Sequence, residues 1–314
     1  MEGDTVVIKH KEYNYLCPMA HKAGFVNIVG NPNVGKSTLM NALVGERLSI
    51  ITSKAQTTRH RILGIINGED FQMVVSDTPG IIKPAYKLQE SMMEFVKNAF
   101  EDADCILYMV ELGEKELKNE AFEKRLTFAE VPVFVLINKI DQGDEQQLAE
   151  AMEHWKERLP QAEIFAISAL ENFGVPQVLN RIVEVLPESP AFYPKDTLTD
   201  KPERFFVNES IREKILMHYK KEIPYAVEIE TEEFFEDEDI IRIRSVIMVE
   251  RETQKGIIIG HKGSAIKRVG TEARKDLQKF FGKQVHIELF VKVNKNWRSN
   301  ERQLRRFGYK GENK

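Results

Sequence analysis

The sequence predicts an α/β domain with a mostly parallel sheet and helices on both faces, followed by a smaller α+β domain. Apolar runs of strand length alternate with helical patterns over residues 23–186, which is the order of parallel strands joined by crossover helices. A polar stretch with four prolines interrupts this alternation at 187–204, and such a stretch forms neither a strand nor a long helix. At 314 residues and 42% apolar content, the chain can fill a core in each domain.

The elements of the first domain follow from its apolar runs. The runs 62–66 and 71–75 flank the turn-like sequence Asn-Gly-Glu-Asp, and they predict an antiparallel hairpin at the edge of the sheet. A helix is expected at 36–44. The other expected strands are 25–29, 106–110, 133–137 and 164–167.

The second domain, 205–314, shows both helical and strand periodicities. Its expected elements are helices at 209–219 and 264–281 and strands at 226–230, 240–250 and 285–291. At the other end of the chain, residues 1–22 show no periodicity, and we expect a poorly ordered tail there. The alternative is an upstream start choice, since Met19 stands just before the first strand.

Composition excludes several classes of protein. With 30% charged residues and no apolar run of 18 residues, the chain fits neither a disordered protein nor a membrane-spanning one. The first residues lack the apolar centre of a signal peptide, so a cytoplasmic location is expected. The two cysteines, Cys17 and Cys105, form neither a disulfide framework nor a zinc-binding pair.

Charge is divided unevenly along the chain. Residues 255–314 contain 16 Lys and Arg against 5 Asp and Glu, so the first 254 residues have a net charge of −15 within a total of −4. A basic end on an acidic body predicts that a polyanion such as nucleic acid binds the C-terminal part. The alternative is a basic tail that is simply solvated.

The segment 30–37 reads GNPNVGKS and lies between an expected strand and an expected helix. This is the phosphate-binding P-loop pattern, in which backbone N–H groups surround the phosphates, the lysine reaches their outer oxygens and the serine binds Mg²⁺. An ordinary glycine turn is the alternative. The predicted nucleotide-binding residues here are Gly30, Asn31, Asn33, Val34, Gly35, Lys36, Ser37 and Thr38.

Three further short motifs follow strands of the first domain. In Asp77-Thr78-Pro79-Gly80, Asp77 is expected to hold Mg²⁺ through water while the N–H of Gly80 meets a γ-phosphate. Alone this motif is a common turn, but it comes after a P-loop here. Its position therefore favours the nucleotide role.

Asn138-Lys139-Ile140-Asp141 follows the strand 133–137 and indicates a guanine site. Asp141 can accept hydrogen bonds from N1–H and the 2-amino group of guanine, a donor pair that adenine lacks. Asn138 is expected to bond the base and tie the loop, and Lys139 to lie along the ring and reach the P-loop. The Ser168-Ala169 pair is expected to offer the Ala169 N–H to the guanine 6-oxo group.

Gly260-His261-Lys262-Gly263 opens a helix after an apolar run, as the GXXG loop of a KH domain does when it clamps single-stranded RNA. The αββααβ order around it is that of the type II KH fold, whereas four letters alone would be a helix-capping turn. Trp297 and Phe307 are candidate stacking platforms, although Trp297 is equally a candidate packing anchor. The basic residues expected to contact RNA are Lys262, Lys267, Arg268, Lys295 and Arg298.

These motifs, taken with the segments ITSKAQTTRHRILGI and SPAFYPKDTLTD, resemble the Era family of bacterial ribosome-assembly GTPases over about residues 20–310. The resemblance implies that residues 56–60 form the first switch. It also implies that Thr58 contacts Mg²⁺ and the γ-phosphate, with Thr57 as the alternative. Lys36, Thr58, Gly80 and Asn33 are then the candidate catalytic residues.

Two residues bear on the rate of hydrolysis. Ile81 stands where Ras-like GTPases have a water-positioning glutamine, so unaided turnover is expected to be slow. Asn33 stands where potassium-activated relatives coordinate K⁺. The resemblance therefore implies stimulation by K⁺, while an ordinary turn asparagine is the alternative.

The resemblance implies a monomeric, Mg²⁺-dependent GTPase that binds the 3′ end of 16S rRNA, and not DNA, and assists assembly of the 30S subunit. Peripheral contact with the inner membrane is left open, but no amphipathic basic helix supports it. The alternatives are a GTPase involved in RNA modification and a KH scaffold that its nucleotide stabilises without significant turnover.

Overall fold

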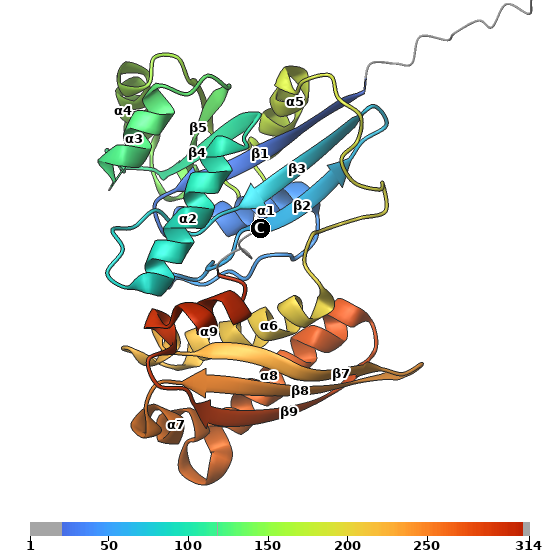
Figure 1. The fold of residues 1–314 in the computed structure, drawn as a ribbon. Helices are drawn as coiled ribbons and strands as arrows, with labels where there is room; N and C mark the ends of the chain where they lie inside the picture. Colours follow the sequence, from blue (N-terminus) through green and yellow to red (C-terminus); the bar gives the residue numbers. More distant parts are fainter. Residues whose placement is uncertain (1–20, 118, 310–314) are drawn as a thin grey trace, which may run out of the picture.

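The structure is a computed structural model that describes residues 21–117 and 119–309. The expected N-terminal tail therefore lies almost wholly outside the described residues. Lys22, the last residue of that expected tail, is instead the first residue of the first strand. Two sheets form the centres of two domains, one above the other in Figure 1.

The first domain is the predicted α/β domain. Its sheet has the order β2-β3-β1-β4-β5-β6, parallel except for β2, which pairs antiparallel with β3 at the edge. The strands are β1 (Lys22–Gly30), β2 (Ile62–Asn67), β3 (Phe71–Asp77), β4 (Cys105–Glu111), β5 (Val133–Asn138) and β6 (Glu163–Ala166). The helices are α1 (Lys36–Val44), α2 (Lys87–Glu101), α3 (Glu120–Thr127), α4 (Glu145–Arg158) and α5 (Val175–Val185), with the short turn η1 (Ile140–Gln142).

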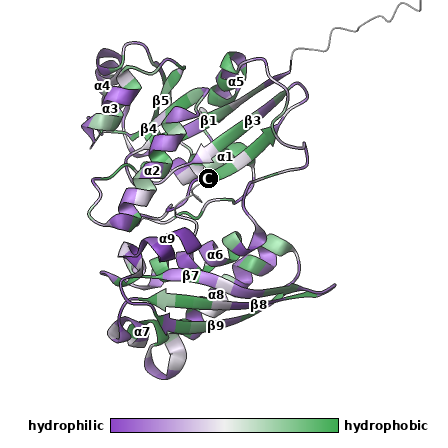
Figure 2. Cartoon of the chain, in the orientation of Figure 1, coloured by the Kyte–Doolittle hydropathy of each residue, from purple (hydrophilic) through white to green (hydrophobic). Residues whose placement is uncertain are grey.

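Helices cover both faces of this sheet, as predicted. Buried side chains of α1 and α5 pack on one face, and those of α2, α3 and α4 pack on the other. The central strands β1 and β3 are mainly hydrophobic in Figure 2, as expected for strands covered on both sides. Each parallel strand therefore delivers the residues at its carboxyl end to one edge of the sheet.

The second domain has a three-stranded sheet of order β7-β8-β9, in which β9 runs parallel to β8 and β7 antiparallel. The strands are β7 (Glu228–Glu236), β8 (Ile240–Val249) and β9 (Gln284–Val293). The helices are α6 (Glu203–His218), α7 (Glu252–Ile259), α8 (Ser264–Phe281) and α9 (Glu301–Arg306), with the short turns η2 (Ile223–Tyr225), η3 (His261–Gly263) and η4 (Trp297–Ser299). The αββααβ order is thus confirmed.

The proline-rich stretch contains no regular strand or helix before α6, as predicted, but it is not a free connection. Gln72 of β3 hydrogen-bonds to the backbone of Phe192 and Tyr193, and Ile65 of β2 donates to the carbonyl of Leu198. The stretch therefore covers the outer edge of the sheet, where unpaired backbone groups would otherwise be exposed.

Hydrophobic packing also crosses between the domains. Trp297, Leu304 and Tyr309, from the C-terminal part of the chain, belong to the same core cluster as the buried residues of α2. In Figure 1, α6 and α9 lie on the side of the second domain that faces the first. No helix among the described residues is long and apolar enough to cross a membrane.

Candidate functional site

The P-loop joins the end of β1 to the start of α1. Gly30, Asn33 and Gly35 have positive φ angles of 154°, 67° and 105°, so the backbone turns tightly before the helix. A Cβ on Gly35 would lie 2.3 Å from Nδ2 of Asn138. Glycine is therefore required there by close approach as well as by φ.

Lys36 lies beneath this loop, with 6% of its surface exposed. Its amine donates to the carbonyls of Gly30 at 3.2 Å and Asn31 at 2.8 Å. Burial lowers the pKa of Lys36 to about 8, although Asp77 and Glu114 act in the opposite direction. A group with this pKa is readily stabilised as a cation by an arriving phosphate.

Three oxygen-bearing side chains meet at the start of α1. The hydroxyls of Ser37 and Thr58 lie 2.9 Å apart, and both donate to Oδ2 of Asp77, at 2.7 and 3.2 Å. Asp77 is fully buried, and burial raises its pKa. Its Oδ1 has no hydrogen-bond partner among the described residues.

A buried carboxylate oxygen without a partner is costly, so it indicates a site built to receive a ligand. Two hydroxyls and a carboxylate form a hard, all-oxygen donor set, which suits Mg²⁺. The structure also separates the two switch threonines. Thr57 directs its hydroxyl to Thr52 and the carbonyl of Lys54, so Thr58 is the threonine at this oxygen cluster.

Asn138 connects the P-loop with the candidate base-recognition loop after β6. Its Nδ2 donates to the carbonyl of Val34 at 2.8 Å, and its Oδ1 accepts from the N–H of Ala169 at 2.9 Å. The expected tie between loops is therefore present. The N–H of Ala169, which we expected to meet the base, is directed to Asn138 in this structure.

Lys139 differs from its expected placement. Its backbone is left-handed, with a φ of 64°, and its amine forms an ion pair with Glu111 at 3.0 Å rather than a contact with the P-loop. Asp141, two residues on, is exposed and lines the same cavity as Lys139. The carboxylate of Asp141 is therefore accessible to a base.

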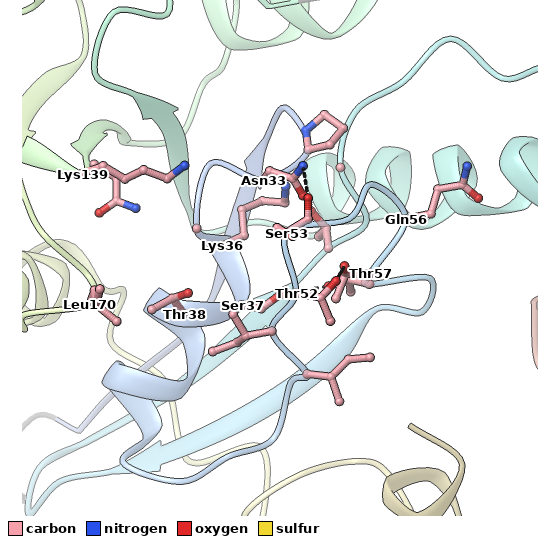
Figure 3. Close-up of a pocket in the computed structure, with 18 of the residues that line it drawn as sticks. Asn33, Lys36, Ser37, Thr38, Thr52, Ser53, Gln56, Thr57, Lys139 and Leu170 are labelled. Carbon is pink, nitrogen blue, oxygen red and sulfur yellow. Dashed lines mark hydrogen bonds between the residues drawn. The ribbon is translucent and has the colours of Figure 1, made fainter. Parts of the chain in front are cut away.

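A cavity of about 650 Å³ unites these motifs (Figure 3). Its lining includes the following predicted residues: Asn33, Gly35, Lys36, Ser37, Thr38, Thr58, Gly80, Asn138, Lys139, Asp141 and Ser168. The predicted residues Gly30, Asn31, Val34, Asp77 and Ala169 do not line the cavity. Asn31 in particular directs its side-chain amide to Glu114 and to the carbonyl of Glu116.

Sequence reasoning missed part of the lining. The segment 50–53 and Leu170 border the cavity, and Leu170 is 73% exposed although it is apolar. Residues 51–53 begin the family-like segment ITSKAQTTRHRILGI, but only residues 56–60 of it were given a role, and a single leucine after Ser-Ala has no distinctive pattern. In Figure 3, Asn33 reaches this segment through a hydrogen bond from its Nδ2 to the carbonyl of Ser53, 3.1 Å long.

The candidate RNA-binding loop lies between α7 and α8. Gly260, Lys262 and Gly263 have positive φ angles of 72°, 49° and 77°. A Cβ on Gly263 would meet no atom within 4 Å, so the loop is open on that side. The N-terminus of α8 follows directly, as an anion-binding turn requires.

The basic residues predicted to contact RNA fall into two groups. The first group is exposed to solvent and comprises His261, Lys262, Lys267, Arg268 and Lys295. Within it, Arg268 forms an ion pair with Glu272. Arg298 is different, because it ion-pairs with Glu250 and its guanidinium lies 5.0 Å from the ring centre of Tyr86 in the first domain. Arg298 is thus engaged within the protein.

Trp297 is fully buried, and its ring N–H donates to the carbonyl of Ala226 at 3.1 Å. Phe307 packs edge-on against it, with ring centres 5.7 Å apart. Trp297 is therefore a packing anchor, and its interpretation as a stacking platform for RNA was wrong. A buried indole has no face to offer a base.

Comparisons with known proteins cover both domains. The family described as 50S ribosome-binding GTPase matches residues 25–139, and the KH domain family matches residues 222–298. GTPase Era of Syntrophus aciditrophicus (strain SB) is 44% identical over 296 residues, which cover 93% of this chain and 97% of that protein. GTPase Era of Thermoanaerobacter sp. (strain X514) is 43% identical, with the same coverage.

Two solved structures are similar to this chain over both of its domains. A crystal structure of Era in complex with MgGDPNP and nucleotides 1506–1542 of 16S ribosomal RNA has a TM-score of 0.88 and 38% identity. A crystal structure of a single-substitution variant of Aquifex aeolicus Era, bound to GDP and AlF4⁻, has a TM-score of 0.87 and the same identity. Each match covers 92% of this chain and 99% of the solved chain.

Proposed function

The chain belongs to the Era family of GTPases, and from this membership we propose that it is a GTP-driven switch that binds the 3′ end of 16S rRNA and acts in 30S subunit assembly. It binds and hydrolyses GTP. The observation that supports the proposal most is the oxygen cluster of Ser37, Thr58 and Asp77, because Ser37 of the P-loop and Thr58 of the first switch meet there and both line the cavity.

Each side chain of the nucleotide site has a task in this proposal. Lys36, as an ammonium, and the N–H groups of the P-loop bind the β- and γ-phosphates. Ser37 and Thr58 would hold Mg²⁺, with Asp77 contributing through water, and the N–H of Gly80 would meet the γ-phosphate. When bound, Mg²⁺ would supply positive charge against the charge that develops on the phosphate oxygens.

Base selection is assigned to the loops after β5 and β6. Asp141 accepts two hydrogen bonds from guanine, and Asn138 fixes the two loops relative to each other by accepting from the N–H of Ala169. Adenine would leave the carboxylate of Asp141 without its donor pair, a loss of about 1–3 kcal/mol in binding. The accessible carboxylate in the cavity supports this role.

We also propose that K⁺ stimulates hydrolysis through Asn33. The side chain of Asn33 donates through its nitrogen to the carbonyl of Ser53, so its oxygen is the end that can coordinate a cation. Ile81, where other GTPases use a glutamine, is fully buried and apolar. A monovalent cation beside the phosphates would supply charge that no side chain next to Gly80 provides.

The RNA-binding part is assigned to the open GXXG loop and the start of α8. Phosphates are expected at Lys262 and at the N-terminus of α8, with Lys267, Arg268 and Lys295 contributing charge. The relative bound to nucleotides 1506–1542 of 16S rRNA shares both domains with this chain. We further propose that the protein works as a monomer in the cytoplasm, where subunits assemble.

The test is binding of a fluorescent RNA with the sequence of the 16S 3′ end, measured by anisotropy with GDPNP and with GDP. A shuffled RNA of the same length is the control. Tighter binding of the native sequence by at least tenfold would support the proposal. Equal affinities for the two RNAs would contradict specific recognition of the 16S 3′ end.

A further inference from the structure

The first switch is fixed to the second domain by two buried arginines. Arg212 of α6 is 2% exposed, and it donates to the backbone carbonyls of Thr57 and, at 3.4 Å, Gln56. Glu209, one turn earlier on α6, pairs with the same guanidinium. The cation of one domain thus binds the backbone of the other.

Arg59 extends in the opposite direction, from the first domain into the second. It is 1% exposed, and it donates to the carbonyl of Val227 at 2.7 Å and to Glu228 at 3.3 Å. It also reaches the carbonyls of Pro224 and Tyr225, both at 3.3 Å. The guanidinium of arginine holds several N–H donors in a rigid plane. Because the donors of Arg59 bind acceptors of the second domain, the backbone at Arg59 is held in place as well.

Thr58 lies between these two attachments. The preceding carbonyl, of Thr57, is bound by Arg212, and the following side chain, of Arg59, is buried in the second domain. The hydroxyl of Thr58 points instead to Ser37 and Asp77. Because each peptide unit is planar and has only two soft dihedrals per residue, fixing both neighbours restricts where this hydroxyl can point.

We infer that Arg212 is a positioning residue for the nucleotide site, which acts across the domain interface by holding Thr58 at the Mg²⁺-binding oxygen cluster. Arg212 touches no nucleotide in this assignment and works only through the backbone at Gln56 and Thr57. The inference rests on the proposed role of Thr58. It makes the GTPase centre incomplete without a residue of the RNA-binding domain.

The experiment compares the full-length protein with the double variant Glu209→Gln/Arg212→Met. The first substitution avoids leaving a carboxylate at Glu209 buried without a partner, which would destabilise the domain for a different reason. In nucleotide-free protein, amide hydrogen exchange of a peptide spanning 53–60 should be at least tenfold faster in the variant. Affinity for GDPNP at limiting Mg²⁺ should fall about tenfold, while affinity for GDP should be unchanged.

Three further variants make the result decisive. Arg212→Lys keeps the charge beside Glu209 but lacks the fork of donors, so it should restore only part of the exchange protection. Lys87→Ala removes an exposed ion pair between the domains, with Glu301 at 3.0 Å, and should behave as wild type. Thr58→Ala should reproduce the loss of GDPNP affinity on its own.

Each contrary outcome has a separate meaning. If Thr58→Ala leaves GDPNP affinity unchanged, the proposed role of Thr58 fails, and the inference fails with it. If only Thr58→Ala has an effect, while the folded double variant matches wild type in exchange and affinity, Arg212 does not position the switch. If Lys87→Ala acts as strongly as the double variant, general separation of the domains explains the result and the specific role of Arg212 is overturned.

Discussion

Asp141 is the single residue on which guanine selection depends in the proposed site. In Asp141→Asn, an amide donor faces the base, so it can pair with the 2-oxo group of xanthine and no longer accepts from the 2-amino group of guanine. We expect affinity for GTP to fall and affinity for xanthosine triphosphate to rise, each by about tenfold or more.

Competition binding with both nucleotides measures this change. Asp144→Asn is the matched control, because Asp144 is the capping residue of α4 outside the cavity and asparagine caps as well as aspartate does. Unchanged preference for GTP in Asp141→Asn would remove the basis of the pocket assignment.

Lys36 makes nucleotide affinity depend on pH. Its pKa in the free protein is about 8, and bound phosphates favour the charged form, so binding takes up a proton once the free amine has lost it. Affinity for GTP should therefore be nearly constant below pH 7 and decrease as the pH rises through 8, approaching tenfold per pH unit.

Isothermal titration between pH 6.5 and 8.5 measures this slope, below the range in which guanine itself loses a proton. Lys36→Arg retains its charge throughout the range and should flatten the curve. A wild-type affinity that stays constant to pH 8.5 would show that the lysine remains protonated in the free protein.

Asn33 is the residue to which K⁺ dependence is assigned. Replacing Na⁺ by K⁺ should raise the turnover of GTP, and Asn33→Ala should abolish this difference while largely sparing GDP binding. Phosphate release in the two salts at equal ionic strength is the measurement. Equal wild-type rates in Na⁺ and K⁺ would rule out the cation site.

The residues of the nucleotide-site motifs were predictable because each of those motifs is contiguous and follows a strand. Side-chain directions were not. Asn31 belongs to the P-loop pattern, yet its amide turns to Glu114. Which partner a side chain meets depends on residues far away in the chain, and no local pattern records that.

Among the elements, the turn between α7 and α8 has the clearest test. Gly263→Asp places an anion where the backbone must approach a phosphate, so RNA affinity should fall by at least tenfold and the salt dependence of binding should weaken by about one counterion. GTP binding should be preserved.

Gly282→Asp provides a matched control at the other end of α8. Gly282 also has a positive φ, 66° against 77° for Gly263, and in neither case does a Cβ meet an atom within 4 Å. The two variants therefore have similar backbone strain, and only the first alters the proposed RNA-binding turn. RNA binding that is weakened equally in both would attribute the effect to the fold rather than to the loop.

Element types were predicted well, but some boundaries were not. β7 continues to Glu236 through an acidic stretch that does not alternate as a strand should, because β8 places arginines opposite, as in the pair of Glu233 with Arg244 at 3.3 Å. Likewise α6 begins at Glu203, six residues before the apolar spacing indicated, since Pro202 is compatible with a helix start.

At the scale of the whole molecule, Trp297 joins the two domains through a shared core. Trp297→Ala should destabilise the protein by about 3–5 kcal/mol, because it leaves a cavity and removes the hydrogen bond to Ala226. Chemical unfolding followed by circular dichroism measures this change.

Phe235→Ala is the control, because Phe235 is 61% exposed and its replacement should lower the free energy of unfolding by less than about 1 kcal/mol. Equal losses of stability in the two variants would contradict the anchoring role of Trp297.

The domain interface was beyond prediction from the sequence. A proline-rich connection favours independent domains. The local sequence around Arg59 and Arg212 does not distinguish these residues from arginines at the surface. Their partners lie more than 150 positions away in the chain. A contact between such distant residues has no periodicity to reveal it, so only the folded arrangement shows that the switch and the second domain share a boundary.

The position of Tyr309 within that boundary has a consequence for how the protein is made. Its ring stacks on His60, with ring centres 4.2 Å apart, and its hydroxyl donates to Glu228. Residue 309 is synthesised 249 positions after residue 60, which at typical rates of translation is a delay of roughly 12–50 s. The nascent first domain can thus enclose its nucleotide cavity long before Tyr309, the last of the described partners of its switch, leaves the ribosome.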